Sequence, residues 1–68
     1  MENVQSVLIN KANYTPKDAI KWLKSFGFIF IKIDETDKYY RFRQKDPALF
    51  KYFVTEDVGN GNKIIFGY

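Results

Sequence analysis

With 68 residues and neither histidine nor cysteine, the chain cannot build a disulfide framework, a thiolate metal site or a catalytic pair that needs an imidazole or a thiol. Hydrophobic residues make up 46% and aromatic residues 19% of it, which excludes a disordered chain and predicts one folded domain over residues 1–68. The net charge of +3 is a mild bias toward acidic partners. We expect a protein that is not an enzyme, with no catalytic residues, no metal and no cofactor.

The beginning of the chain, Met1-Glu2-Asn3-Val4, lacks the basic region and the long apolar run of a signal peptide. No stretch of about 18 apolar residues is available to span a bilayer. We therefore expect a cytoplasmic location and no membrane partner.

The first two predicted elements are a strand and a helix. Residues 4–10 contain a short apolar run that is typical of a strand. Thr15 is a helix N-cap, Pro16 suits the first helical position, and Gly27 ends the helix. At 100° per residue, one helix face collects apolar side chains and should be buried, namely those of Ala19, Ile20, Trp22, Leu23 and Phe26. The other face carries a solvated basic stripe of Lys17, Lys21 and Lys24.

The rest of the chain predicts two hairpins. Residues 28–33 and 39–44 are rich in β-branched and aromatic residues, and the polar residues 35–38 form the turn between them. Pro47 breaks the second strand, and residues 48–50 form a short helical turn. Residues 51–56 and 63–68 form the last hairpin, which turns at Asn60-Gly61. We therefore predict an α+β fold in the order β-α-β-β-β-β, with one helix packed on a mostly antiparallel sheet of four to five strands.

The first hairpin carries the candidate working surface. If Asp34 pairs with Tyr39, then Ile33 lies opposite Tyr40 on the apolar face that suits the helix. Ile31 then lies opposite Phe42 on that same face. The other face collects Phe28, Phe30, Lys32, Tyr39, Arg41 and Arg43, with Lys32 across from Arg41 and Phe30 across from Arg43.

Such a face suits an anionic partner with flat groups. Like charges placed opposite each other destabilise a sheet, and exposed aromatic rings gain from being covered. Single-stranded DNA or RNA meets both conditions, because aromatic side chains stack on bases and basic groups neutralise phosphate. The candidate binding residues are Phe30, Lys32, Tyr39, Arg41 and Arg43. Two alternatives remain open, a protein partner on the same face and a face that is merely solvated.

Two other groups of polar residues are better explained as turns than as ligand-binding sites. Asp34, Glu35 and Asp37 share one turn but lack the spacing and the glycine of a calcium loop. Residues 59–62 do not precede a helix as a phosphate-binding loop would, so a hairpin turn accounts for them.

The stretch from Thr15 to Gln44, including Tyr40-Arg41-Phe42-Arg43-Gln44, resembles small domains encoded by bacteriophages and related mobile elements. Gly59-Asn60-Gly61 and the residues 63–67 that follow are similar to the tail of those domains. The resemblance implies a viral origin and a location in the cytoplasm of the host cell. It does not imply any particular activity. Such domains carry basic residues where residues 54–57 stand here, which weakens contact of the last hairpin with nucleic acid.

Two functions follow as expectations. The first is a small phage-type accessory protein that binds single-stranded DNA or RNA through its basic and aromatic sheet face. The alternative is a protein-binding module, such as a phage inhibitor of a host defence complex or a homo-oligomerising component. A chain this short has little room for a deep small-molecule pocket, so surface binding is the expected mode.

Overall fold

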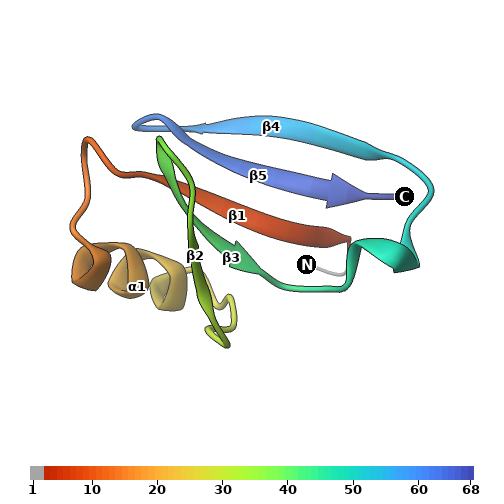
Figure 1. Ribbon diagram of the computed structural model, residues 1–68, viewed down its shortest axis with the longest axis horizontal. Helices are drawn as coiled ribbons and strands as arrows, with labels where there is room; N and C mark the ends of the chain where they lie inside the picture. Colours follow the sequence, from red (N-terminus) through yellow and green to blue (C-terminus); the bar gives the residue numbers. More distant parts are fainter. Residues whose placement is uncertain (1–2) are drawn as a thin grey trace.

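The computed structural model describes residues 3–68. One helix packs on a five-stranded antiparallel sheet (Figure 1), which confirms the predicted α+β class and element order. The elements are β1 (Val4–Asn10), α1 (Pro16–Ser25), β2 (Ile33–Glu35), β3 (Tyr39–Arg43), a 3₁₀ turn (Pro47–Leu49), β4 (Phe53–Gly59) and β5 (Asn62–Gly67).

The sheet is built around the first strand of the chain. Its order is β2-β3-β1-β5-β4, so each predicted hairpin lies on one side of β1. β1 pairs antiparallel with both β3 and β5. Val7 and Ile9 of β1 are fully buried, as expected for a strand with neighbours on both sides and a helix above it.

The predicted ends of α1 are confirmed by the geometry of its caps. The Thr15 side chain accepts a hydrogen bond from the Asp18 N–H at 3.2 Å. At the other end Gly27 has a φ of +79°, a conformation that glycine adopts without steric cost. The Gly27 N–H donates to the Lys24 carbonyl and the Phe28 N–H donates to the Leu23 carbonyl. This pair of bonds is the Schellman motif, and it turns the chain back toward the sheet.

The core lies between α1 and one half of the sheet. Ala19 and Leu23 of the helix are fully buried against a cluster formed by Val4, Val7, Ile9, Tyr40, Phe42 and Ile64. Trp22 and Ile20 are only partly buried, so their predicted burial is confirmed in part. Phe26 is 58% exposed, and its predicted burial is wrong. Phe26 is the residue that caps α1, and its ring packs on Trp22 at a centroid distance of 4.5 Å instead. A helix of ten residues is only about 15 Å long. Figure 1 accordingly shows it beneath one part of the sheet, with β4 far from it.

The predicted strand over residues 28–33 is mostly wrong, because only Ile33–Glu35 pairs with β3. The Gln44 side chain takes the place of a neighbouring strand at Ile29. Its Oε1 accepts from the Ile29 N–H at 3.0 Å, and its Nε2 donates to the Ile29 carbonyl at 2.9 Å. The backbone groups of Ile29 are thus satisfied without a ladder, and residues 28–32 follow an irregular path.

The register of the first hairpin also differs from the prediction. Glu35, rather than Ile33, pairs with Tyr40, and Ile33 pairs with Phe42. The turn is shorter than expected, since the Thr36 N–H donates to the Tyr39 carbonyl at 2.8 Å. A slip of two residues leaves every side chain on its predicted face, because strand side chains alternate with a period of two. The faces of β3 are therefore as expected, while its cross-strand neighbours are not.

The last hairpin turns where the sequence predicts. Asn60 and Gly61 both have positive φ, 55° and 77°, as a two-residue hairpin turn of this kind requires. The turn packs against the segment after β1, where the Asn13 side chain donates to the Asn60 carbonyl at 2.7 Å.

Truncation of two apolar side chains of α1 tests this packing. Leu23→Ala should reduce the free energy of unfolding by about 2–5 kcal/mol, because it opens a cavity in the core. Phe26→Ala should cost no more than about 1.5 kcal/mol, since it removes one exposed ring contact. Urea unfolding followed by circular dichroism measures both, and equal losses would contradict the exposed position of Phe26.

Candidate nucleic-acid interface

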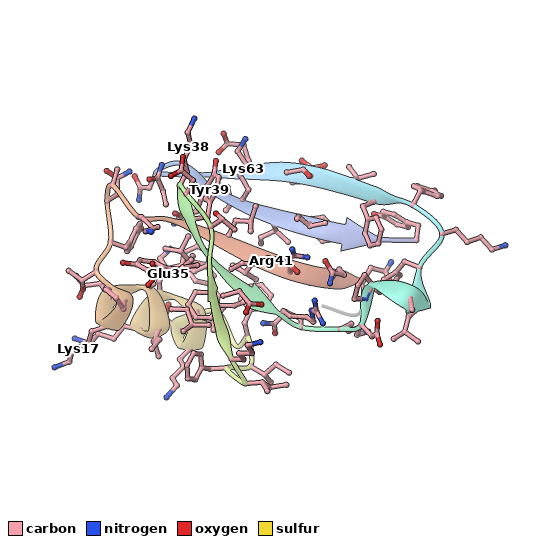
Figure 2. All side chains as sticks on the ribbon, viewed as in Figure 1. Lys17, Glu35, Lys38, Tyr39, Arg41 and Lys63 are labelled. Carbon is pink, nitrogen blue, oxygen red and sulfur yellow. The ribbon has the colours of Figure 1, made fainter. Side chains whose placement is uncertain are left out.

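The sheet face opposite α1, here called the open face, carries most of the predicted binding residues. Along β3 the side chains of Tyr40 and Phe42 enter the core beneath α1. The alternation of a strand therefore directs Tyr39, Arg41 and Arg43 to the open face. Figure 2 shows Tyr39 near the turn at the start of β3 and Arg41 farther along the strand.

Cross-strand pairing adds a cation that the sequence analysis missed. The register joins one row across all five strands, which consists of Asp34, Arg41, Leu8, Lys63 and Asp57. Lys63 of β5 thus shares the open face with Arg41, and a carboxylate ends the row at each edge. Lys63 directly precedes the buried Ile64, and the alternation of side chains along a strand therefore puts Lys63 on the open face.

The expected facing pair of Lys32 and Arg41 is wrong. The residue opposite Arg41 is Asp34, because of the two-residue slip of the hairpin. Lys32 precedes β2 and forms an ion pair with Asp34, with its Nζ 3.4 Å from Oδ1. The open face therefore contains compensating charges where the sequence predicted two adjacent cations.

Arg41 is held in place by a chain of buried hydrogen bonds. Its Nε donates to the Ser6 Oγ at 3.3 Å, and the Ser6 hydroxyl donates to the Gln5 Oε1 at 2.8 Å. The Gln5 Nε2 then donates to the Lys45 carbonyl at 2.9 Å. Ser6 and Gln5 are almost fully buried, so the stem of Arg41 is fixed against the sheet. The two Nη groups of Arg41 make no hydrogen bond or ion pair with residues 3–68, which leaves them available to a ligand.

Lys32 and Arg43 lie beside the same pocket at the edge of the sheet. Both line a shallow pocket of about 310 Å³, together with Ile31, Asp34, Gln44, Lys45 and Asp46. The pocket contains both cations and carboxylates, so its electrostatic field is mixed. Arg43 itself is exposed.

Phe30 does not lie with the other predicted residues. Its ring is 5.8 Å from the ring of Phe42, on the core side of the sheet, and it is 40% exposed. The alternation that placed it on the open face fails because residues 28–32 are not a paired strand. Phe30 is therefore not on the open face.

Other aromatic rings reach the open face at the far end of the sheet. Phe53 of β4 lies opposite Gly67 of β5, and its ring meets that of Phe50 at 6.1 Å. The Phe50 ring covers Gly67 so closely that a Cβ at Gly67 would overlap it. These two rings replace Phe30 as the aromatic part of the open face, and the sequence analysis did not identify them.

The lysines of α1 lie away from this face. Lys17, Lys21 and Lys24 are exposed on the helix, and Figure 2 shows Lys17 pointing outward from it. They form the solvated stripe that the helical pattern predicts, on the opposite side of the molecule from the open face.

No protein-family model, curated protein or solved structure matches this chain. In residues 3–68 no three His, Cys, Asp or Glu side chains are grouped so that they could hold a metal ion. The one helix of that range is too short and too polar to cross a membrane. Functional inference therefore depends on the geometry of the sheet.

The hydrogen-bond chain behind Arg41 has a measurable energy. Ser6→Ala removes the acceptor for Arg41 and leaves the buried Gln5 Oε1 without its donor. We expect a loss of about 1–3 kcal/mol in the free energy of unfolding, the cost of an unsatisfied buried group. Urea unfolding measures it, with Ser25→Ala as the control on the exposed end of α1. A loss no larger than that of the control would contradict the role of Ser6.

Proposed function

We propose that this protein is a small phage-type accessory protein, acting in the cytoplasm of a host cell, that binds single-stranded DNA or RNA through the open face. The observation that carries the proposal is the joint position of Arg41, Arg43 and Lys63 on a sheet face that α1 leaves uncovered. Tyr39 lies on the same face at one end, and Phe50 and Phe53 lie at the other.

The arrangement suits a single strand for electrostatic and geometric reasons. Arg41 and Lys63 are two strands apart, a separation of about 10 Å, so the cationic zone is narrow. Asp34 and Asp57 close it at the two edges and repel a polyanion there. Single-stranded DNA or RNA lying along the middle of the sheet would place its phosphates at Arg41 and Lys63. Its bases would then lie against the aromatic rings of the open face, where stacking contributes about 1–3 kcal/mol per base.

A protein partner is the second candidate, favoured by apolar side chains beside β2. Phe26, Ile29 and Ile31 are between 51% and 75% exposed. Apolar side chains that are exposed close together in one segment are typical of a surface that binds another protein. A pull-down from host lysate, with and without nuclease, separates the two candidates. Partners that vanish with nuclease support nucleic-acid binding, and partners that persist support a direct protein contact.

Salt dependence tests the proposed function. The logarithm of the affinity for single-stranded DNA or RNA should fall linearly with the logarithm of the salt concentration, by about 0.7 for each phosphate contacted. Arg41→Ala with Arg43→Ala should flatten that slope by about 1.4, because two contacts are lost. Fluorescence anisotropy of a labelled oligonucleotide measures the slope.

The matched control is Lys17→Ala with Lys21→Ala, which removes the same charge from the helix. Its slope should equal that of the unaltered protein. The proposal is wrong if no binding occurs at about 50 mM salt or if both double variants change the slope equally.

A further inference from the structure

β4 is an exposed edge strand that no other element of residues 3–68 covers. Each of its seven residues is exposed, and Figure 1 shows it forming one border of the sheet. The other border, β2, has only three residues, and Lys11 binds there to the Glu35 carboxylate at 3.0 Å and to the Thr36 carbonyl at 3.2 Å. Short strands and nearby charges are the usual protection of sheet edges. β2 has this protection, and β4 is the edge that remains open to pairing.

The backbone groups of β4 point outward at known positions. Tyr52 and Tyr68 exchange two hydrogen bonds, with N···O distances of 3.2 and 3.0 Å. Hydrogen-bonded pairs alternate along an antiparallel ladder, so Val54 is the next residue that bonds to β5. Phe53 and Thr55 therefore direct their N–H and C=O groups to the free edge. No hydrogen bond to these groups occurs within residues 3–68.

The two halves of β4 differ in protection. The second half carries Glu56 and Asp57 and a β-bulge between Asp57 and Gly59, all of which discourage pairing. The first half carries Phe53, 46% exposed, and Val54, 40% exposed, residues that favour strands. A partner strand should therefore pair around Val54.

We propose that two copies of this protein pair edge to edge through β4, antiparallel and centred on Val54. In this register Val54 faces Val54 of the second copy, and Phe53 and Thr55 exchange backbone hydrogen bonds with their counterparts. Lys51 lies two residues before β4 and is exposed, so in this register its side chain comes near Asp57 of the second copy, and the two-fold axis gives two such opposite-charge pairs. Charge complementarity thus identifies the second copy as the occupant of the edge.

Neighbouring registers fit less well. Outward N–H and C=O groups occur at every second residue of β4, as at Phe53 and Thr55. The two strands can therefore slide past each other only in steps of two residues, and each step moves the centre of the pair by one residue. A shift toward the turn centres the pair on Thr55 and places Val54 against Glu56 and Phe53 against Asp57. A further shift places Glu56 against Glu56, and like charges directly opposite each other are destabilising. A shift the other way separates Lys51 from Asp57.

Pairing of this kind joins the two sheets into one. The two-fold axis stands perpendicular to the sheet, so both copies of α1 lie on one side and both open faces lie on the other. The inference does not depend on nucleic-acid binding, because β4 pairs through its edge and not through the open face.

Sedimentation equilibrium from about 1 µM to about 1 mM protein tests the proposal. The unaltered protein should associate to a dimer and no further, since the two-fold contact uses up the free edge of both copies. Thr55→Pro should remain monomeric with an unchanged circular dichroism spectrum, because the lost N–H points away from β5. The matched control is Thr55→Ala, which changes the same side chain but keeps the outward N–H and should therefore dimerise, with self-association measured in folded samples only.

A charge exchange tests the register. Asp57→Lys alone and Lys51→Asp alone should each weaken self-association by at least about tenfold, because each places like charges opposite each other. When the two single variants are mixed, both facing pairs become opposite in sign, and a mixed dimer should form. The doubly exchanged chain, Lys51→Asp with Asp57→Lys, should regain self-association.

Three outcomes would overturn the proposal. The first is an unaltered protein that stays monomeric up to about 1 mM. The second is a dimer that Thr55→Pro leaves intact, which would place the contact on another surface. The third is a mixture of the two single variants that associates no better than either variant alone.

Discussion

Burial of the apolar side of β1 and β3 beneath α1 is the constraint on which the rest of the molecule depends. Leu23 and Ala19 pack on Val7, Ile9 and Phe42, and all five are almost completely removed from water. Once those side chains face the helix, alternation along each strand leaves the residues between them on the opposite face. The position of Arg41 and Arg43 on the open face is thus a direct consequence of hydrophobic burial on the other side of the same strand.

The size of the helix sets the asymmetry of the sheet. The core beneath the ten-residue helix takes its buried strand residues from β1, β3 and β5, whereas all seven residues of β4 are exposed. The β4 edge is consequently held by β5 alone, and its side chains are exposed on both faces. Exposed edges with strand-forming residues invite a further strand, so the short helix leaves β4 as an edge that can pair.

Local hydrogen bonds decide the details of the open face. The amide of Gln44 satisfies the backbone of Ile29 and so ends the ladder at Ile33, which removes Phe30 from the face. The buried chain from Gln5 through Ser6 to Arg41 fixes one guanidinium against the sheet. Both effects come from side-chain groups that reach across the fold, and each changes which residues a ligand can touch.

The sequence by itself determined the elements whose signals are local. Capping residues around α1, the apolar run of β1 and the Asn60-Gly61 turn each act through neighbours in the chain, so their positions were predictable. The faces of β3 were predictable for the same reason, because alternation needs no knowledge of the partner strand. Tyr39, Arg41 and Arg43 were therefore placed correctly.

The tertiary structure alone decided the strand order, the hairpin register and the membership of the open face. Asp34 lies opposite Arg41, and Lys63 joins the same row, only because β3 and β5 both pair with β1. The exposure of Phe26 and the displacement of Phe30 depend on where a short helix ends and on what Gln44 binds. These contacts join residues far apart in the chain, and their free energies compete with local preference, so the pattern of residues along one strand does not contain them.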